Sequence, residues 1–338
     1  MRASHNGWRA LVLSGGGAKG EFQVGALECL RERTDWDFDF YTGVSVGALN
    51  VAVLAQHDRM SDGLGKLSAI WESLRSNRDV YTGGSIAIGA LLSLFTRSRL
   101  ARDSIFNSAP IAGLIERHVK WAEFKRGFSV GVTSLTDGMP YTVTNVPTIL
   151  DANPRNGRTL SLTLEPGQPG SIPDRIADFI LASASMPLLF PPVEIYGHKF
   201  VDGGVRDVTP LSSAFQAAKA AANGGWQGDM EILIISTAPA VLPLNGGQHL
   251  DSGREIIGRS LEIMIHEILT NDVALASTLN ELAYAQQQFI RVPVRHVRPE
   301  ADLGLGALDF SNLKARQEAR RLGYMAMEKH LAEDRMVA

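Results

Sequence analysis

A serine stands between glycines in the pattern Gly43-Val44-Ser45-Val46-Gly47. This is the G-x-S-x-G pattern, in which a nucleophilic serine occupies a sharp turn between a strand and a helix. The flanking glycines leave room for that turn, and the start of the following helix favours developing negative charge. The pattern predicts Ser45 as a nucleophile, with Gly43 and Gly47 as supporting residues. The alternative is a serine at an ordinary helix N-cap.

A second run of small residues precedes a predicted helix nearer the N-terminus. Bare backbone N–H groups in such a run form a nest that binds an anion, and in acyl transfer the anion is the tetrahedral oxyanion. Lys19 in this run either adds positive charge or lies in solvent. The residues expected to form an oxyanion hole are Gly15, Gly16, Gly17, Ala18, Lys19 and Gly20.

The same run also satisfies the pattern G-x-G-x-x-G at Gly15, Gly17 and Gly20. That pattern is typical of dinucleotide-binding loops, and acidic residues follow at residues 35–39, the distance that such a loop requires. The serine turn at residues 43–47 disfavours this interpretation, because it stands where the ribose-binding end would be expected. Dinucleotide binding is therefore a remote alternative.

A serine nucleophile needs a base that accepts its proton. Asp202-Gly203-Gly204 follows a predicted strand, in an open turn where the carboxylate is accessible. The chain has eight histidines, none in a comparable motif, and His198 is expected at a hairpin edge. A Ser45–Asp202 dyad is the economical solution, with Gly203 and Gly204 as supporting residues. The alternative for Asp202 is a turn-forming Asp-Gly pair.

Regular elements must hold these residues in place. The chain opens with a strand at 10–13, a loop at 14–20 and a helix at 21–33, and then repeats the unit with a strand at 38–42, a turn and a helix. Two such units predict an α/β fold with a central parallel or mixed sheet flanked by helices. Further strands are expected at 128–133, 141–144, 199–201, 232–236 and 289–292. Helices are expected at 174–185 and 310–331, and one long helix or a broken pair at 246–287.

Neither an internal repeat nor a convincing linker interrupts the chain. We therefore expect one domain over residues 1–338, with a motif-bearing core at 9–240 and a helical C-terminal part at 241–338. The apolar segment 83–95 is a candidate for a mobile lid or a helix that contacts a membrane. The alternative is a helix packed on the sheet.

The composition excludes several classes of protein. The net charge of −3 gives no basic footprint for nucleic acid, and no pattern of Ca²⁺ ligands is present. No apolar run approaches the roughly 20 residues of a membrane-spanning helix, and none reads as a signal-peptide core. We expect no metal and no cofactor. We expect a cytoplasmic protein, or one exported without a cleavable signal, whose membrane contact is peripheral.

The glycine run, the serine turn and Asp202-Gly203-Gly204 come in one order, and in that order the chain resembles the patatin-like phospholipase family. The stretches 182–187, 190–192 and 205–210 are also similar to segments of that family, so the resemblance covers roughly residues 9–240. The resemblance implies a three-layer fold related to α/β-hydrolases, with Ser45 as nucleophile, Asp202 as proton acceptor and an oxyanion hole at Gly15–Gly17.

These features predict a serine acyl hydrolase that cleaves lipid esters through an acyl-enzyme intermediate. The resemblance implies an enzyme of the phospholipase A or lysophospholipase type, which meets its substrate at a lipid or membrane surface. A non-specific carboxylesterase and a lipase that needs an activating protein partner are the alternatives.

Overall fold

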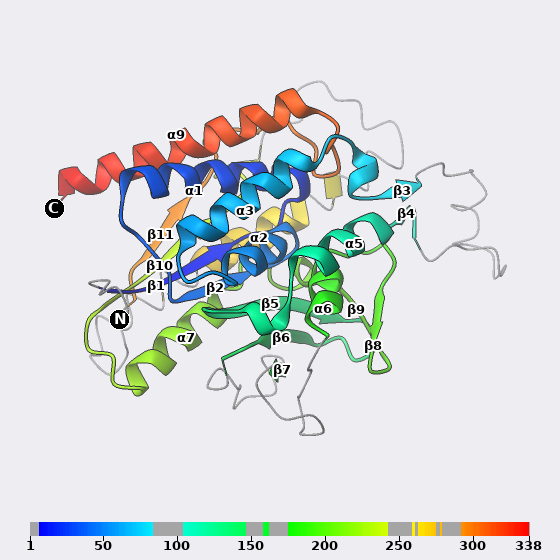
Figure 1. Ribbon diagram of the computed structural model, residues 1–338, viewed down its shortest axis with the longest axis horizontal. Coiled ribbons are helices and arrows are strands. Elements are labelled where there is room, and N and C mark those ends of the chain that lie inside the picture. The colour runs from blue at the N-terminus through cyan, green and yellow to red at the C-terminus, as the bar shows by residue number, and fades with distance from the viewer. Residues whose placement is uncertain are drawn as a thin grey trace.

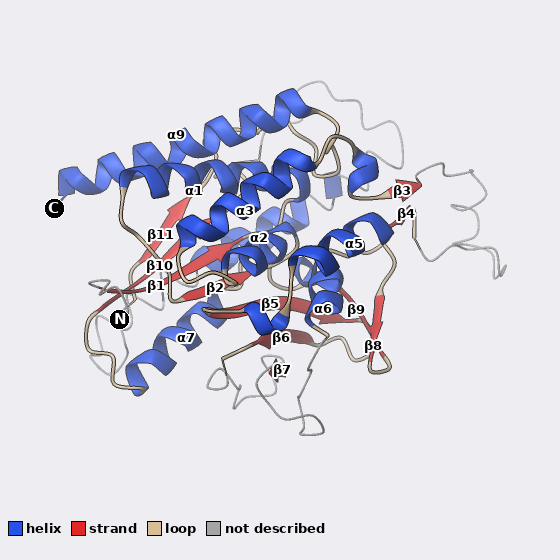
Figure 2. Cartoon of the chain, viewed as in Figure 1, coloured by secondary structure: helices blue, strands red, loops and turns tan. Residues whose placement is uncertain are grey.

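The computed structural model describes residues 7–83, 104–146, 158–161, 175–242, 259–260, 263–274, 278 and 292–337. Helices lie on both faces of one central mixed sheet (Figures 1 and 2). The strand order is β11-β10-β1-β2-β5-β6-β7, and the hairpin of β8 and β9 joins through β5. The predicted α/β fold is confirmed.

The five strands from β11 to β5 run parallel to one another, whereas β6 and β9 are antiparallel to β5. A separate two-stranded ribbon is formed by β3 (Thr82–Gly83) and β4 (Phe106–Asn107). The strands of the large sheet are β1 (Gly7–Leu13), β2 (Phe40–Gly43), β5 (Gly127–Ser134), β6 (Pro140–Thr144), β7 (Arg158–Ser161), β8 (Val193–Ile195), β9 (His198–Asp202), β10 (Asp229–Ile235) and β11 (Val294–Val297).

The helices form the two outer layers. In Figure 1, α1, α3 and α9 lie above the sheet, and α7 lies beneath it. The α-helices with described bounds are α1 (Glu21–Arg33), α2 (Val46–Leu54), α3 (Met60–Ser73), α5 (Ala109–His118), α6 (Ile176–Ser183), α7 (Leu211–Asn223) and α9 (Leu313–Val337). Residues 263–274 are also helical.

Strand β1 shows why the sheet is covered on both sides. Successive side chains of a strand point to opposite faces. Leu11 and Leu13 therefore join the core beneath α1 and α2, while Ala10 and Val12 pack in a second core against Leu211 and the rest of α7. All of these side chains on β1 are fully buried, so this strand is the centre of the molecule.

The C-terminal part differs from its prediction. It is not only helical, because β11 adds an edge strand to the sheet. Of the strand expected at 289–292, residues 289–291 lie outside the described residues and Val292 is not in a strand; β11 begins at Val294, directly after Pro293, which lacks the N–H that a strand interior requires. The predicted lid at 83–95, apart from Gly83, and most of the helix predicted at 246–287 lie outside the described residues. No helix in the described ranges is long and apolar enough to cross a bilayer.

Candidate active site

Ser45 occupies the sharp turn between β2 and α2. Its backbone has φ 56° and ψ −127°, a strained conformation for a residue with a side chain. The turn is tight enough that a Cβ on Gly43 would stand 2.5 Å from the carbonyl of Gly47, and one on Gly47 would clash with Leu13 O. The structure therefore gives the physical reason for both glycines of the pattern.

The end of α6 holds this turn from the side. Ser45 N donates a hydrogen bond to Ser183 Oγ at 3.1 Å, and Ser183 Oγ donates to Gly131 O at 2.7 Å. Ser183 is fully buried. It belongs to the stretch 182–187, but its contact with the serine turn joins residues 138 positions apart, and no local pattern reveals that.

Asp202 is the last residue of β9 and is 2% exposed. Its Oδ1 accepts a hydrogen bond from Gly204 N at 2.8 Å. A Cβ on Gly203 would clash with Gly131 O, and one on Gly204 would press on Asp202 Oδ1 at 3.0 Å. The two glycines thus allow β9 to end close to β5 with the aspartate turned inward. His198 lies at the other end of β9, in the β8–β9 hairpin, as predicted.

Ser45 and Asp202 come together although 157 positions separate them in the sequence. Burial raises the pKa of Asp202 to about 7, against smaller lowering effects of hydrogen bonds from the Gly204 amide and the Ser45 hydroxyl. The Oδ2 atom of Asp202 is buried and makes no full hydrogen bond in the described part of the chain. This carboxyl therefore has a near-neutral pKa and lies beside a strained serine, a combination that is typical of functional sites.

The glycine run lies against Ser45. A Cβ on Gly15 would stand 3.2 Å from Ser45 Cβ and 3.9 Å from its Oγ. Some amides of the run are already bonded: Gly15 N donates to Val208 O, Ala18 N to Ala307 O and Lys19 N to Gly16 O. The N–H groups of Gly16 and Gly17 have no acceptor within the described ranges. These two are the amides of the run that remain available to an anion.

Segments late in the chain support the glycine run. Thr237 Oγ1 donates to Gly15 O at 2.6 Å, and Ala307 O accepts from Ala18 N at 2.8 Å. Lys19 forms an ion pair with Asp302 at 3.8 Å, so it is not simply solvated. Gly17 has φ +58°, where a Cβ would clash with Ala307 O.

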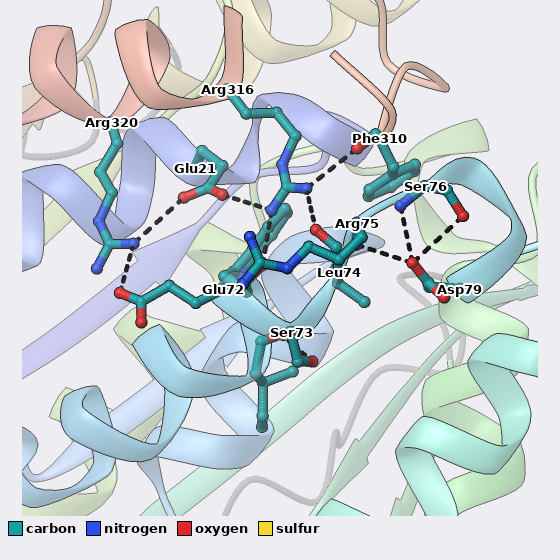
Figure 3. A network of polar contacts seen from close by, with 12 residues as sticks. Glu21, Glu72, Ser73, Leu74, Arg75, Ser76, Asp79, Phe310, Arg316 and Arg320 are labelled. Carbon is teal, nitrogen blue, oxygen red and sulfur yellow. Dashed lines mark hydrogen bonds and ion pairs between the residues drawn. The ribbon is translucent and has the colours of Figure 1, made fainter. Parts of the chain in front are cut away.

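A buried arginine ties the C-terminal helix to this region (Figure 3). Arg316 of α9 is 3% exposed. Its guanidinium donates to Glu21 Oε1 at 2.7 Å, to Trp71 O at 2.7 Å, to Leu74 O at 2.7 Å and to Phe310 O at 3.0 Å. One side chain thus joins the first residue of α1, the end of α3 and the segment before α9. Nothing in the sequence pattern around Arg316 indicates this role.

The loop after Asp202 carries a second carboxyl contact. Asp207 and Asp272 lie close enough to interact electrostatically, and Asp207 Oδ1 accepts a hydrogen bond from Thr209 N at 3.1 Å. Burial raises the pKa of both carboxyls, and that of Asp272 is raised further by the charge of Asp207. The pair therefore keeps a proton more readily than two separate carboxyls would, and it places the helical residues 263–274 next to the loop that follows Asp202.

Ser45 and Asp202 lie in the wall of a cavity with a volume of about 1170 Å³. Most of the other residues that line the cavity have apolar side chains. They come from α2, α3, α5 and α6 and from the segments 186–190 and 304–310. Among the described residues, no group of three or more His, Cys, Asp and Glu could hold a metal ion. The arrangement can therefore place an apolar ligand against a serine, a carboxyl and free amides.

The sequence matches the family model described as "Patatin-like phospholipase" over residues 11–215. That range is more than half of the 338 residues, so the chain belongs to the patatin-like phospholipase family. It is accordingly a lipid acyl hydrolase. No curated protein matches the sequence significantly.

Solved structures of two bacterial proteins align with nearly the whole chain. VipD from Legionella pneumophila matches at 14% identity with a TM-score of 0.45, over 98% of this chain and 67% of its own. ExoU of the Pseudomonas aeruginosa type III secretion system, solved in complex with SpcU, matches at 14% identity with a TM-score of 0.36, over 98% of this chain and 52% of its own. The chain thus spans about two thirds of the VipD chain and about half of the ExoU chain.

Proposed function

We propose that this protein hydrolyses acyl esters of lipids, as a phospholipase A or lysophospholipase, with Ser45 as nucleophile and Asp202 as its base. One observation carries the proposal: the strained Ser45 and the buried Asp202 carboxyl, whose pKa the Ser45 side chain is near enough to lower, both lie in the wall of a large apolar cavity. The Ser–Asp pair supplies the activated nucleophile that covalent acyl transfer requires.

In the first step Ser45 Oγ attacks the ester carbonyl carbon, and its proton passes to Asp202. The carbonyl oxygen takes the electron pair of the broken π bond and becomes an oxyanion. The free N–H groups of Gly16 and Gly17 stabilise it, aided by the positive end of α2. The intermediate then expels the alcohol or lysolipid oxygen, which takes the proton from Asp202, and the acyl group remains on Ser45.

In the second step a water molecule gives its proton to Asp202 as its oxygen attacks the acyl carbon. A second oxyanion forms at the same amides. Its collapse breaks the bond to Ser45 Oγ, which recovers the proton from Asp202, and the fatty acid leaves. The near-neutral pKa of Asp202 suits this exchange, because a base works best when its pKa lies near the working pH.

The rim of the cavity supports a lipid surface as the place of reaction. Leu188, Val205 and Met264 line the cavity, yet they are 53%, 43% and 58% exposed. Large apolar side chains gathered at the mouth of a cavity favour peripheral contact with a lipid aggregate. We also propose that residues 1–338 form one domain, since α9 packs along α1 and Arg316 of α9 bonds to Glu21 at the start of α1 (Figure 3).

The test compares wild type with Ser45→Ala and Asp202→Asn on a p-nitrophenyl acyl ester and on phospholipid vesicles. We expect both variants to fold and to lose at least about a thousandfold in kcat/KM, as loss of a nucleophile or its base does in other serine hydrolases. Ser213→Ala is the matched control. That buried serine lies on α7, on the opposite face of the sheet.

The outcomes separate the alternatives. Activity on the soluble ester alone indicates a non-specific carboxylesterase. Activity only after addition of a cell extract indicates a lipase that needs a protein activator. Full activity of the folded Ser45→Ala variant would refute the proposal.

A further inference from the structure

The inner part of the cavity is bounded by three helices on one side of the sheet. Each contributes side chains at positions i, i+3, i+4 and i+7, which is one face of a helix. The lining residues are Val46, Leu49, Asn50 and Val53 from α2, Leu67, Ile70, Trp71 and Leu74 from α3 and its end, and Ile111, Leu114, Ile115 and His118 from α5. Each set covers about 10 Å along its helix.

Hydrogen bonds show how these helices run. The C-terminal ends of α2 and α5 meet at Gln56, whose Nε2 donates to His118 O at 3.0 Å and whose Oε1 accepts from Lys120 N at 2.9 Å. Helix α3 runs the other way, because Trp71 Nε1, near its end, donates to Asn50 Oδ1 at 3.0 Å. Ser45, directly before α2, is thus at one end of the three faces.

The opposite end is closed by apolar side chains. Val53 of α2, Leu67 of α3 and Val119 after α5 all line the cavity there. They are 4%, 2% and 4% exposed. The cavity therefore extends from Ser45 along α2 and ends among these three residues.

The polar groups inside this region are already satisfied or uncharged. The amide of Asn50 accepts from the Trp71 indole and donates to Gln23 Oε1 at 2.9 Å. Burial, together with the charges of Lys66 and Arg117, lowers the pKa of His118, which favours the neutral imidazole. A polar ligand would lose hydrogen bonds to water on entering, whereas a hydrocarbon chain would not.

We propose that this region binds the acyl chain of the substrate as a tunnel that starts at Ser45 and is blocked at its far end. Val53 and Leu67 then set the longest acyl chain that the tunnel accepts. The inference rests on the proposed function, because the ester carbonyl must lie at Ser45. The eight residue-to-residue steps from Ser45 to Val53 advance about 12 Å along α2. An extended chain advances roughly 1.2 Å per bond, since three backbone bonds cover about 3.6 Å, so about ten carbons fill the tunnel.

The experiment measures kcat/KM for p-nitrophenyl esters from C4 to C16 at constant detergent, for wild type, Val53→Phe and Val53→Ala. For wild type we expect a rise of up to about fourfold per added methylene, a maximum near C10 and a decline beyond it. Val53→Phe should lower kcat/KM for C10 at least tenfold and change C4 less than twofold. Val53→Ala should move the maximum to longer chains.

Leu135→Phe is the control, because Leu135 is 53% exposed and lies in the turn after β5, outside the cavity lining. It should leave the chain-length profile unchanged. The proposal is overturned if folded Val53→Phe alters C4 and C10 equally, or if wild type shows no maximum up to C16. If Val53→Phe does not fold, an unmoved maximum in Val53→Ala overturns it. Loss of the proposed function is a different result, in which wild type shows no Ser45-dependent hydrolysis at any chain length.

Discussion

Replacing Asp202 by asparagine is expected to abolish activity and yet to stabilise the folded protein at alkaline pH. Burial raises the pKa of this carboxyl from 3.8 to about 7, whereas the unfolded chain titrates near the ordinary value. The folded protein therefore binds the proton more tightly than the unfolded chain does. The stability that comes from this group is fully present below about pH 4 and is lost as the pH rises to about 7.

The magnitude follows from the size of the shift. About three pH units at 1.36 kcal/mol each give an upper bound of about 4 kcal/mol in the free energy of unfolding. Asparagine does not ionise, so Asp202→Asn should gain up to this amount over wild type above pH 7 and nothing near pH 4. For 338 residues the entropy of unfolding is about 0.7 kcal/mol/K, and the gain corresponds to a Tm about 6 °C higher.

The assay is thermal unfolding of both proteins in buffers from pH 4 to pH 9, with ester hydrolysis measured in parallel. The kcat/KM of wild type should rise about tenfold per pH unit and level off near pH 7, where Asp202 becomes ionised. Ser45→Ala is the control: it keeps Asp202 but removes a hydroxyl that lowers the pKa of that carboxyl, so its stability profile should shift to higher pH. A difference in Tm between Asp202→Asn and wild type that does not change with pH would refute the reasoning.

Three further substitutions test the supports of the site. Gly17→Ala should lower kcat by about a hundredfold, as loss of an oxyanion donor does. The reason is that Gly17 has φ +58° and that Ala307 leaves no room for a Cβ. An unchanged kcat in steady-state assays would contradict this prediction. Thr237→Val should reduce kcat about fivefold to tenfold without changing KM, since it removes one hydrogen bond to the glycine run, and Thr237→Ser should restore the rate. Arg316→Met should reduce the free energy of unfolding by about 3–5 kcal/mol in urea titrations, because it removes the nearer cation of the buried Glu21 carboxylate and leaves only the longer contact with Arg320 at 3.8 Å. Arg321→Met, on the exposed side of the same helix, should stay within about 0.5 kcal/mol.

The sequence predicted those parts of the fold and site whose constraints are local. The serine turn, Asp202-Gly203-Gly204 and the glycine run each need special backbone geometry, and that need appears as glycine at fixed positions. Strand β1 and helix α9 also follow from local apolar patterns. These elements agree with the structure, apart from small differences at their ends.

The supporting residues could not be predicted, because their roles depend on contacts between distant segments. The Thr237 hydroxyl bonds to Gly15 across 222 positions, and Arg316 bonds to Glu21 across 295. Neither residue stands in a motif. Asp207 was visible in the stretch after Asp202, but its partner Asp272 lies in a segment whose pattern predicted only helix. The match to the family model ends at residue 215, so it does not extend to Thr237, Asp272 or Arg316.

The place of β1 in the sheet has a consequence for synthesis on the ribosome. This central strand pairs with β2 on one side, but its other partner, β10, begins about 220 residues later. At 5–20 residues per second, roughly ten to forty seconds pass before β10 is made. During that time one edge of β1 is open, and an open apolar edge is a template for aggregation. We therefore expect nascent chains that stop before Asp229 to require a chaperone. Such chains contain the complete serine turn, but they lack β10, the strand that pairs with the open edge of β1.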